Sequence, residues 1–330
     1  MSLQDIKSLK VNLENKILSS NQVMIIPHKS ADFDAIASSI GISIISQELK
    51  KDNHIVIGDA SYDLDHGVQS IIEEVKDSNS IICVDEYEKR KTTNTLNVLC
   101  DVNKPNLTYI KEFDRDHLAI LDHHYKDDET FDAEIEHIDT SISSTSELLV
   151  CLLGAYRIHI PANIANILLT GILLDTNRLS KNVSRDTMRT VAKLLEKGAS
   201  MDKAGEFFTE DFNSDRRVQE LVNSTKFLNY TTAVIKAGED KEYTREELAK
   251  AADYLLRYKV DAAYAIGNIG DGIISISARS KESVNVGDVM RQLGGGGNQF
   301  SGATKIEGAT IEETEKKLQK IILPYYSVRK

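Results

Sequence analysis

Acidic and imidazole side chains follow four separate apolar runs in this chain, and metal binding is the chemistry that they suit. The side chains are His28, Asp32 and Asp34 after residues 23–26, Asp85 after 81–84, Asp122, His123 and His124 after 118–121, and Asp175 after 172–174. Mixed imidazole and carboxylate ligands favour Mn²⁺, with Mg²⁺, Co²⁺ or Fe²⁺ as alternatives. The pattern therefore predicts a divalent metal site.

The number of candidate ligands predicts two ions. The set comprises His28, Asp32, Asp34, Asp85, His123 and Asp175. Two cations about 3.5–4 Å apart can activate a water and hold phosphoryl oxygens, and we expect Asp85 to bridge them. Each acid also has a plainer interpretation, because Asp32 or Asp34 can cap a helix, and Asp85 or Asp175 can serve in a cap or turn.

Four consecutive glycines, Gly294–Gly297, are the second notable feature. Glycine lets the backbone approach a ligand closely and offer N–H groups to an anion; a flexible hinge is the alternative. Upstream, Arg279 at the end of an apolar run can clamp a phosphate, although an arginine at a strand end is also ordinary on a protein surface.

Composition narrows the class of protein. The chain has 330 residues, of which 41% are hydrophobic, and a net charge of −11, which disfavours disorder and binding to long nucleic acids. The scattered Cys83, Cys100 and Cys151 predict a reduced, cytoplasmic protein. We expect no signal peptide and no membrane span, although the chain could be the soluble part of a longer, membrane-anchored protein.

Apolar periodicity predicts the elements that position these residues. Strands are expected at residues 23–27, 54–57, 81–84 and 118–121, and helices at 3–19, 34–49, 67–76, 145–156, 161–174 and 184–197. Alternating strands and helices favour a parallel sheet, whose ligands collect at the carboxyl ends of the strands.

The alternation of apolar strands and helices stops after about residue 200, where the sequence becomes more polar. Residues 206–227 are expected to form a helical linker between a first domain at 1–205 and a smaller α/β domain at 228–330. In the second domain, strands at 232–235, 262–266 and 273–278 and helices at 244–257, 285–293 and 310–322 are expected. Gly270-Asp271-Gly272 is typical of a hairpin turn.

These motifs together resemble the DHH phosphoesterase family, in the branch with a DHH-associated C-terminal domain. The family's four motifs are similar to residues 28–35, Asp85, Asp122-His123-His124 and residues 170–176, and its glycine motif is similar to Gly294–Gly297. The resemblance extends from about residue 20 to 325. It implies two lobes, with the metals in the first and the substrate in the cleft between them.

Other segments resemble the GdpP-type cyclic di-AMP phosphodiesterases within this family. They are residues 143–148, 175–177, 184–187, 276–280 and 286–304. Two features depart from the family. Asn298 stands where the family usually has histidine, and the segment between Asp85 and Asp122 is longer, so an extra hairpin is expected there.

The resemblance implies hydrolysis of cyclic di-AMP to linear pApA, and further to AMP, by a metal-activated water. The implied catalytic residues are Asp85, Asp122, His123 and His124. The implied substrate-binding residues are His124, Ser146, Arg279, Ser280, Gly294, Gly295, Gly296, Gly297 and Asn298. Rival hypotheses are a nanoRNase acting on linear dinucleotides, a pyrophosphatase or polyphosphatase, and a non-catalytic module that binds cyclic dinucleotides. The sequence leaves a homodimer open.

Overall fold

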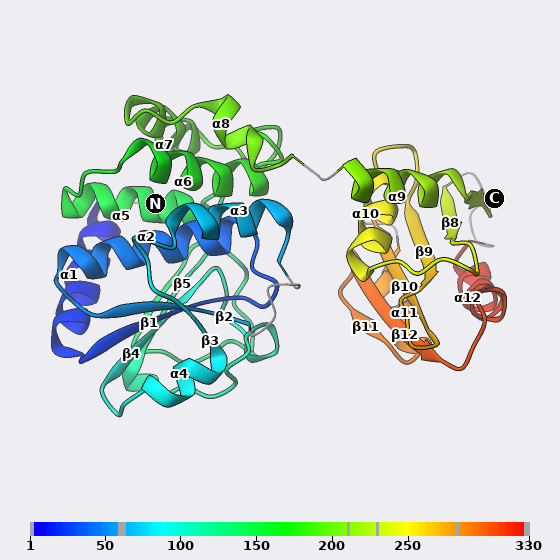
Figure 1. Cartoon of the computed structure of the whole chain (residues 1–330), viewed down its shortest axis with the longest axis horizontal. Coiled ribbons are helices and arrows are strands. Elements are labelled where there is room, and N and C mark those ends of the chain that lie inside the picture. Colours follow the sequence, from blue (N-terminus) through cyan, green and yellow to red (C-terminus); the bar gives the residue numbers. More distant parts are fainter. Residues whose placement is uncertain (1–2, 59–63, 210–211, 229–230, 282–283, 327–330) are drawn as a thin grey trace. The chain divides into compact units, whose positions relative to one another are not determined.

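The computed structural model describes residues 3–58, 64–209, 212–228, 231–281 and 284–326 (Figure 1). Internal contacts divide the chain into two compact units, Met1–Thr209 and Glu210–Lys330. The expected linker, residues 206–227, lies across this boundary. Its main helix, α9 (Phe212–Asn223), packs on α10 (Arg245–Leu255) of the second unit.

The first unit is built on a six-stranded sheet, and its strands are parallel, as the sequence predicted. Its strands are β1 (Gln22–Pro27), β2 (Asn53–Ile57), β3 (Ile81–Cys83), β4 (Thr95–Cys100), β5 (Leu118–Asp122) and β6 (Ile135–Ile138). Their order is β3-β2-β1-β4-β5-β6, and every adjacent pair is parallel. The sheet therefore presents the carboxyl ends of β1, β4 and β5 side by side.

Apolar side chains cover both faces of this sheet. Val23 and Ile25 of β1 join the core beneath the helices, whereas Met24 and Ile26 join a smaller core that includes Tyr87. The helices are α1 (Leu3–Ser19), α2 (Phe33–Glu48), α3 (His66–Val75), α4 (Val84–Arg90), α5 (Thr145–Tyr156), α6 (Ala162–Asp175), α7 (Arg185–Glu196) and α8 (Met201–Glu206). In Figure 1, α2, α5 and α6 lie on one side of the sheet and α4 on the other.

Strand β4 corrects the sequence-based prediction. We expected the segment between Asp85 and Asp122 to form an extra hairpin, but residues 95–100 pair in parallel with β1 and β5 near the centre of the sheet. All six residues of β4 are buried. The segment also contributes two short 3₁₀ helices, Pro105–Leu107 and Arg115–His117.

The second unit contains a mixed sheet of six strands. They are β7 (Thr225–Phe227), β8 (Thr232–Lys236), β9 (Ala262–Asn268), β10 (Ile273–Ser280), β11 (Gly296–Gly297) and β12 (Ser301–Glu307), in the order β11-β12-β10-β9-β8-β7. The predicted hairpin is confirmed, because β9 and β10 pair antiparallel across residues 270–272, which all have positive φ. Helices α11 (Val286–Gln292) and α12 (Ile311–Tyr326) complete the unit.

Among the described residues, no helix is long and apolar enough to cross a membrane.

Candidate metal centre

The carboxyl ends of three neighbouring strands deliver most of the candidate ligands. His28 directly follows β1, Asp101 follows β4, and Asp122-His123-His124 ends and follows β5. These strands are adjacent in the sheet (Figure 1). Asp34 comes from the first turn of α2, and Asp175 is the last residue of α6. Helix ends therefore supply the remaining candidate ligands.

Three overlapping groups of side chains within the described part of the chain are close enough to hold a cation. They are His28, Asp32 and Asp101; Asp34, His123 and Asp175; and Asp101, His123 and His124. Within each group, the potential ligand atoms lie within 4.8 Å of one another. Because Asp101 belongs to two groups that include different histidines, the arrangement suits a pair of ions with a shared carboxylate.

Asp101 is the centre of the cluster. Its Oδ2 lies 3.7 Å from His28 Nε2, and its Oδ1 lies 3.3 Å from His123 Nε2 and 3.5 Å from His124 Nδ1. The side chain is almost fully buried, and the backbone has φ of 60°. Aspartate tolerates this left-handed conformation better than most residues. The Asp101 carboxylate lies between His28, which follows β1, and His123, which follows β5.

Asp85 does not lie in the cluster, which corrects the expectation that it bridges two ions. It lies in the first turn of α4, after β3, and none of the three groups includes it. Since β3 is an edge strand, β2 and β1 separate it from β4. Asp101 was missed because β4 was missed, although it follows Val98-Leu99-Cys100 in the same way that the other candidate acids follow apolar runs.

Asp34 is held by the start of α5. Its Oδ2 accepts a hydrogen bond from Thr145 N at 2.7 Å, and its Oδ1 accepts one from Ser146 N at 2.7 Å. The amide groups at a helix N-terminus stabilise negative charge. Thr145 Oγ1 also donates to Asp101 Oδ1 at 3.1 Å, so the same turn of α5 positions both carboxylates.

Asp32 has both of the roles that the sequence left open. Its Oδ1 caps α2 by accepting hydrogen bonds from the N–H groups of Asp34 and Ala35. Its Oδ2 lies 3.6 Å from His28 Nε2. Burial lowers the pKa of His28, but the hydrogen bond and charge of Asp32 outweigh burial and raise that pKa to about 9.

The geometry around His123 and Asp175 fits a bound cation. His123 Nε2 faces three carboxylates, at 3.3 Å from Asp101, 3.4 Å from Asp175 and 4.0 Å from Asp34. Among the residues that the structure describes, Asp175 Oδ2 is buried and has no hydrogen-bond partner. Burial and the charges of Asp34 and Asp101 raise the pKa of Asp175 far above its usual value. A divalent ion between these groups would relieve both the crowding and the unmet hydrogen-bonding capacity.

Asp122 orders the turn that carries the two histidines. Its Oδ1 accepts hydrogen bonds from the backbone N–H groups of His123 and His124, at 2.7 and 3.1 Å. The same oxygen lies 2.8 Å from His124 Nδ1, and this hydrogen bond raises the pKa of His124. His124 is 59% exposed, so it is available to a substrate, whereas Asp122 is fully buried and acts through its neighbours.

Close packing of α6 against α2 and α5 depends on Gly171. A Cβ at this position would lie 2.3 Å from Ser146 Oγ and 2.9 Å from Asp34 Oδ1. The Ser146 hydroxyl is buried here and has no hydrogen-bond partner in the described part of the chain. Ser146, which the family resemblance implicates in substrate binding, therefore lies beside α6 and Asp34, next to the candidate metal cluster.

The residues predicted to bind substrate in the second unit are largely engaged within that unit. Arg279 Nε donates to Asp253 Oδ2 at 2.9 Å. Ser280 Oγ is buried and lies within hydrogen-bond distance of the carbonyl oxygens of Val284 and Gln299. The Asn298 Oδ1 accepts hydrogen bonds from two backbone N–H groups, those of residues 300 and 301, at 2.8 Å each.

Comparison with known proteins agrees with both units. Residues 22–172 match the DHH family, N-terminal domain, and residues 227–323 match the DHHA1 domain. The chain belongs to the DHH family. The two matches confirm the resemblance and the fold class predicted from the sequence, and the candidate ligand groups agree with the predicted class of enzyme, a DHH phosphoesterase.

Two curated relatives cover nearly all of this DHH-family chain. It is 29% identical over 324 residues to the cyclic-di-AMP phosphodiesterase GdpP of Geobacillus thermodenitrificans. It is 29% identical over 322 residues to the cyclic-di-AMP phosphodiesterase PdeA of Listeria monocytogenes. Each alignment includes 95% of this chain and 49% of the relative, so the chain spans about half the length of these proteins.

One solved structure has the same fold along the chain. It is an exopolyphosphatase-related protein from Bacteroides fragilis, with a TM-score of 0.77, 20% sequence identity and coverage of 96% of both chains. At this identity the likeness establishes the two-domain fold.

We predict that Asp101→Asn weakens metal binding and lowers kcat/KM by at least about 100-fold, since even groups that only orient metal ligands contribute 10–100-fold. Asparagine tolerates the same backbone conformation, so the protein should still fold. Asp85→Asn is the matched control and should stay close to wild type. Mn²⁺ titration by calorimetry and turnover of bis(p-nitrophenyl) phosphate measure both effects. A larger loss of Mn²⁺ affinity and kcat/KM in Asp85→Asn than in Asp101→Asn would show that Asp85 is the central ligand.

Gly171→Ala is expected to lower activity by about 100-fold, because displacing Asp34 by about 1 Å misplaces the bound cation. Gly154→Ala is the control within the neighbouring helix α5, where an added Cβ meets nothing within 4 Å. This control should keep full activity and gain about 1 kcal/mol of stability. Equal activity in the two variants would show that the close approach of Gly171 to Asp34 is not needed for activity.

Metal-free protein should lose stability as the pH rises above the ordinary range of a carboxyl group. The folded-state pKa of Asp175 is raised by burial and by neighbouring charge, so the folded protein binds more protons than the unfolded chain, and stability falls with pH. Asp175→Asn should flatten this dependence between pH 5 and 8 and be more stable than wild type at pH 8. Urea unfolding in EDTA measures both; an unchanged slope in the variant would contradict the assignment.

Proposed function

We propose that this chain hydrolyses cyclic di-AMP to linear pApA, and more slowly to AMP, using two divalent cations, with Mn²⁺ as the preferred ion. The observation that carries the proposal is the alignment of 95% of the chain with proteins named cyclic-di-AMP phosphodiesterases. The ligand groups centred on Asp101 support the metal dependence. Proposed metal ligands are His28, Asp32, Asp34, Asp101, His123 and Asp175.

The bound cations would supply a water nucleophile at neutral pH and stabilise charge on the phosphoryl oxygens. The protein's part is to hold the ligands in place before the substrate arrives. The start of α5 orients Asp34 and Asp101 through backbone and hydroxyl donors. Ligands fixed in this way do not have to reorganise during the reaction.

His124 is the proposed contact with the reacting phosphate. Its Nδ1 faces Asp122 Oδ1, so the imidazole is oriented and the Nε2–H is left to donate a hydrogen bond to a phosphoryl oxygen. The raised pKa of His124 favours the protonated ring, which strengthens that hydrogen bond. Asp122 thereby takes part in catalysis by positioning His124, rather than by touching the substrate.

In the second unit, Arg279 and the segment from Gly294 to Asn298 are proposed to orient the part of the substrate that does not react. Arg279 is 23% exposed and anchored by Asp253, so it can offer a fixed guanidinium to a phosphate. Asn298 keeps its loop closed through its side-chain oxygen. In this proposal, it contributes loop shape where the family's histidine would contribute charge.

Turnover of cyclic di-AMP, linear pApA and a short RNA, compared side by side with Mn²⁺ and resolved by chromatography, tests the proposal. We expect ring opening to have the highest kcat/KM, because the relatives that align along the chain are named for that substrate. Faster cleavage of pApA or RNA would assign the chain to linear dinucleotides instead. Binding of cyclic di-AMP without turnover in Mn²⁺ would indicate a sensor, and His124→Ala is the inactive control.

A further inference from the structure

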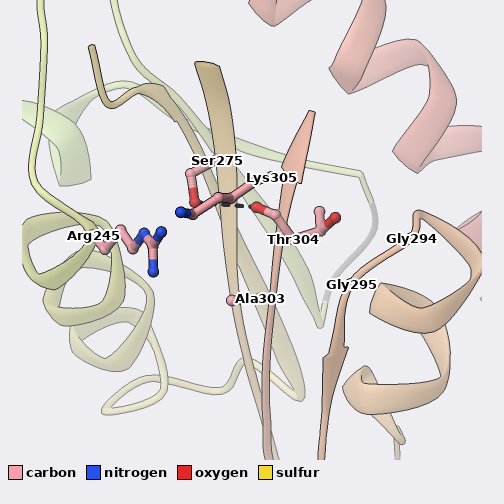
Figure 2. Close-up of a pocket in the computed structure, with 7 residues that line it drawn as sticks. All are labelled: Arg245, Ser275, Gly294, Gly295, Ala303, Thr304 and Lys305. Carbon is pink, nitrogen blue, oxygen red and sulfur yellow. Dashed lines mark hydrogen bonds between the residues drawn. The ribbon is translucent and has the colours of Figure 1, made fainter. Parts of the chain in front are cut away.

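A pocket of about 310 Å³ opens on the second unit beside the start of α10. Its lining comes from α10, strands β10 and β12, and the turn after α11 (Figure 2). The lining residues are Arg245, Ser275, Gly294, Gly295, Ala303, Thr304 and Lys305. Only the two glycines belong to the residues that the family resemblance implicates in substrate binding.

Two cations converge in this pocket. The side chains of Arg245 and Lys305 point toward one another over Ser275 (Figure 2), and neither Asp nor Glu occurs in the lining. Within the described part of the chain, neither cation has a carboxylate partner. Other arginines of this unit are paired, as in Arg217–Glu247 and Arg291–Asp288. In a chain with a net charge of −11, converging unpaired cations indicate a site for an anion.

The wall and floor of the pocket are held by internal hydrogen bonds. Ser275 Oγ donates to Thr304 O at 3.1 Å, and Thr304 Oγ1 donates to Leu293 O at 3.0 Å, which ties β12 to the end of α11. A Cβ on Gly295 would lie 2.1 Å from Ala303 O, so only glycine lets this wall approach β12 so closely. The pocket is therefore formed before any ligand binds.

The glycines build the wall and do not supply the charge recognition. The N–H groups of Gly294 and Gly295 donate to Arg291 O and Met290 O, which closes the end of α11. From the sequence we expected the glycine N–H groups to bind an anion. Those of Gly294 and Gly295 cannot do so, because they already donate to backbone carbonyl oxygens. Recognition in the pocket must come from the side chains of Arg245 and Lys305.

We propose that this pocket binds the phosphate group of a nucleotide-sized ligand. Arginine offers two parallel N–H donors to a phosphate, and lysine adds a point charge. A volume of about 310 Å³ lies at the lower end of the range for small-molecule sites, which begins at about 300 Å³. The phosphate belongs either to the proposed substrate or to a separate nucleotide. The binding itself does not depend on catalysis at the metal centre.

Calorimetric titration of the whole 330-residue chain with 5′-AMP and with inorganic phosphate, in EDTA and low salt, tests the site without metal. We expect saturable binding of AMP, and a rise in Kd of about tenfold or more in Arg245→Gln and in Lys305→Gln, as for loss of a charged hydrogen bond. Lys317→Gln removes an exposed lysine of α12 outside the lining and should match wild type. Adenosine, which lacks phosphate, should bind more weakly than AMP.

The source of the phosphate follows from kinetics of the same variants. If the pocket holds part of the substrate, KM for cyclic di-AMP or pApA rises in Lys305→Gln while kcat is retained. If it holds a separate nucleotide, KM is unchanged and only AMP binding is lost. Both results support the site. No saturable binding of AMP or phosphate to wild type, or equal Kd values in wild type and both pocket variants, would overturn it, whatever the enzyme's substrate proves to be.

Discussion

Crowding of negative charge at the carboxyl ends of β1, β4 and β5 is the constraint on which the rest of the first unit depends. Asp34, Asp101 and Asp122 are almost fully buried there, and Asp175 lies beside them. Buried carboxylates are costly unless they are hydrogen-bonded or bind a cation. Asp34 and Asp122 each receive two backbone N–H donors. For Asp101 and Asp175, by contrast, burial and neighbouring carboxylates raise the pKa, which marks them as the groups that most need a cation.

The helices that cover the sheet are arranged to meet this constraint. The start of α5 reaches the cluster because α2 packs closely on both α5 and α6. Gly41 and Gly171 allow that packing, since a Cβ on either would lie 3.0 Å or less from a neighbouring side chain. Glu147, buried near the start of α5, accepts hydrogen bonds from Ser143 and from Thr187 of α7. The proposed metal ligands thus rest on a tightly joined group of helices.

The second unit presents the opposite charge pattern. Its glycine-rich turn closes α11 and approaches β12, and the resulting pocket contains two cations and no carboxylate. Asn298 uses its side-chain oxygen to close the adjoining loop. In both units, therefore, hydrogen bonds between backbone and side chain build the shape around the side chains that are proposed to bind a ligand.

The sequence by itself determined the parallel sheet, most element positions, the hairpin at 270–272 and five of the six proposed metal ligands. It could do so because apolar periodicity and turn residues act locally. The sixth ligand was decided by tertiary structure. Asp85 and Asp101 both follow short apolar runs, and nothing local distinguishes an edge strand from a central one. Strand order places Asp101 between His28 and His123 and leaves Asp85 at the far edge. The convergence of Arg245 and Lys305, 60 residues apart in sequence, likewise exists only because α10 packs on β10, which pairs with β12.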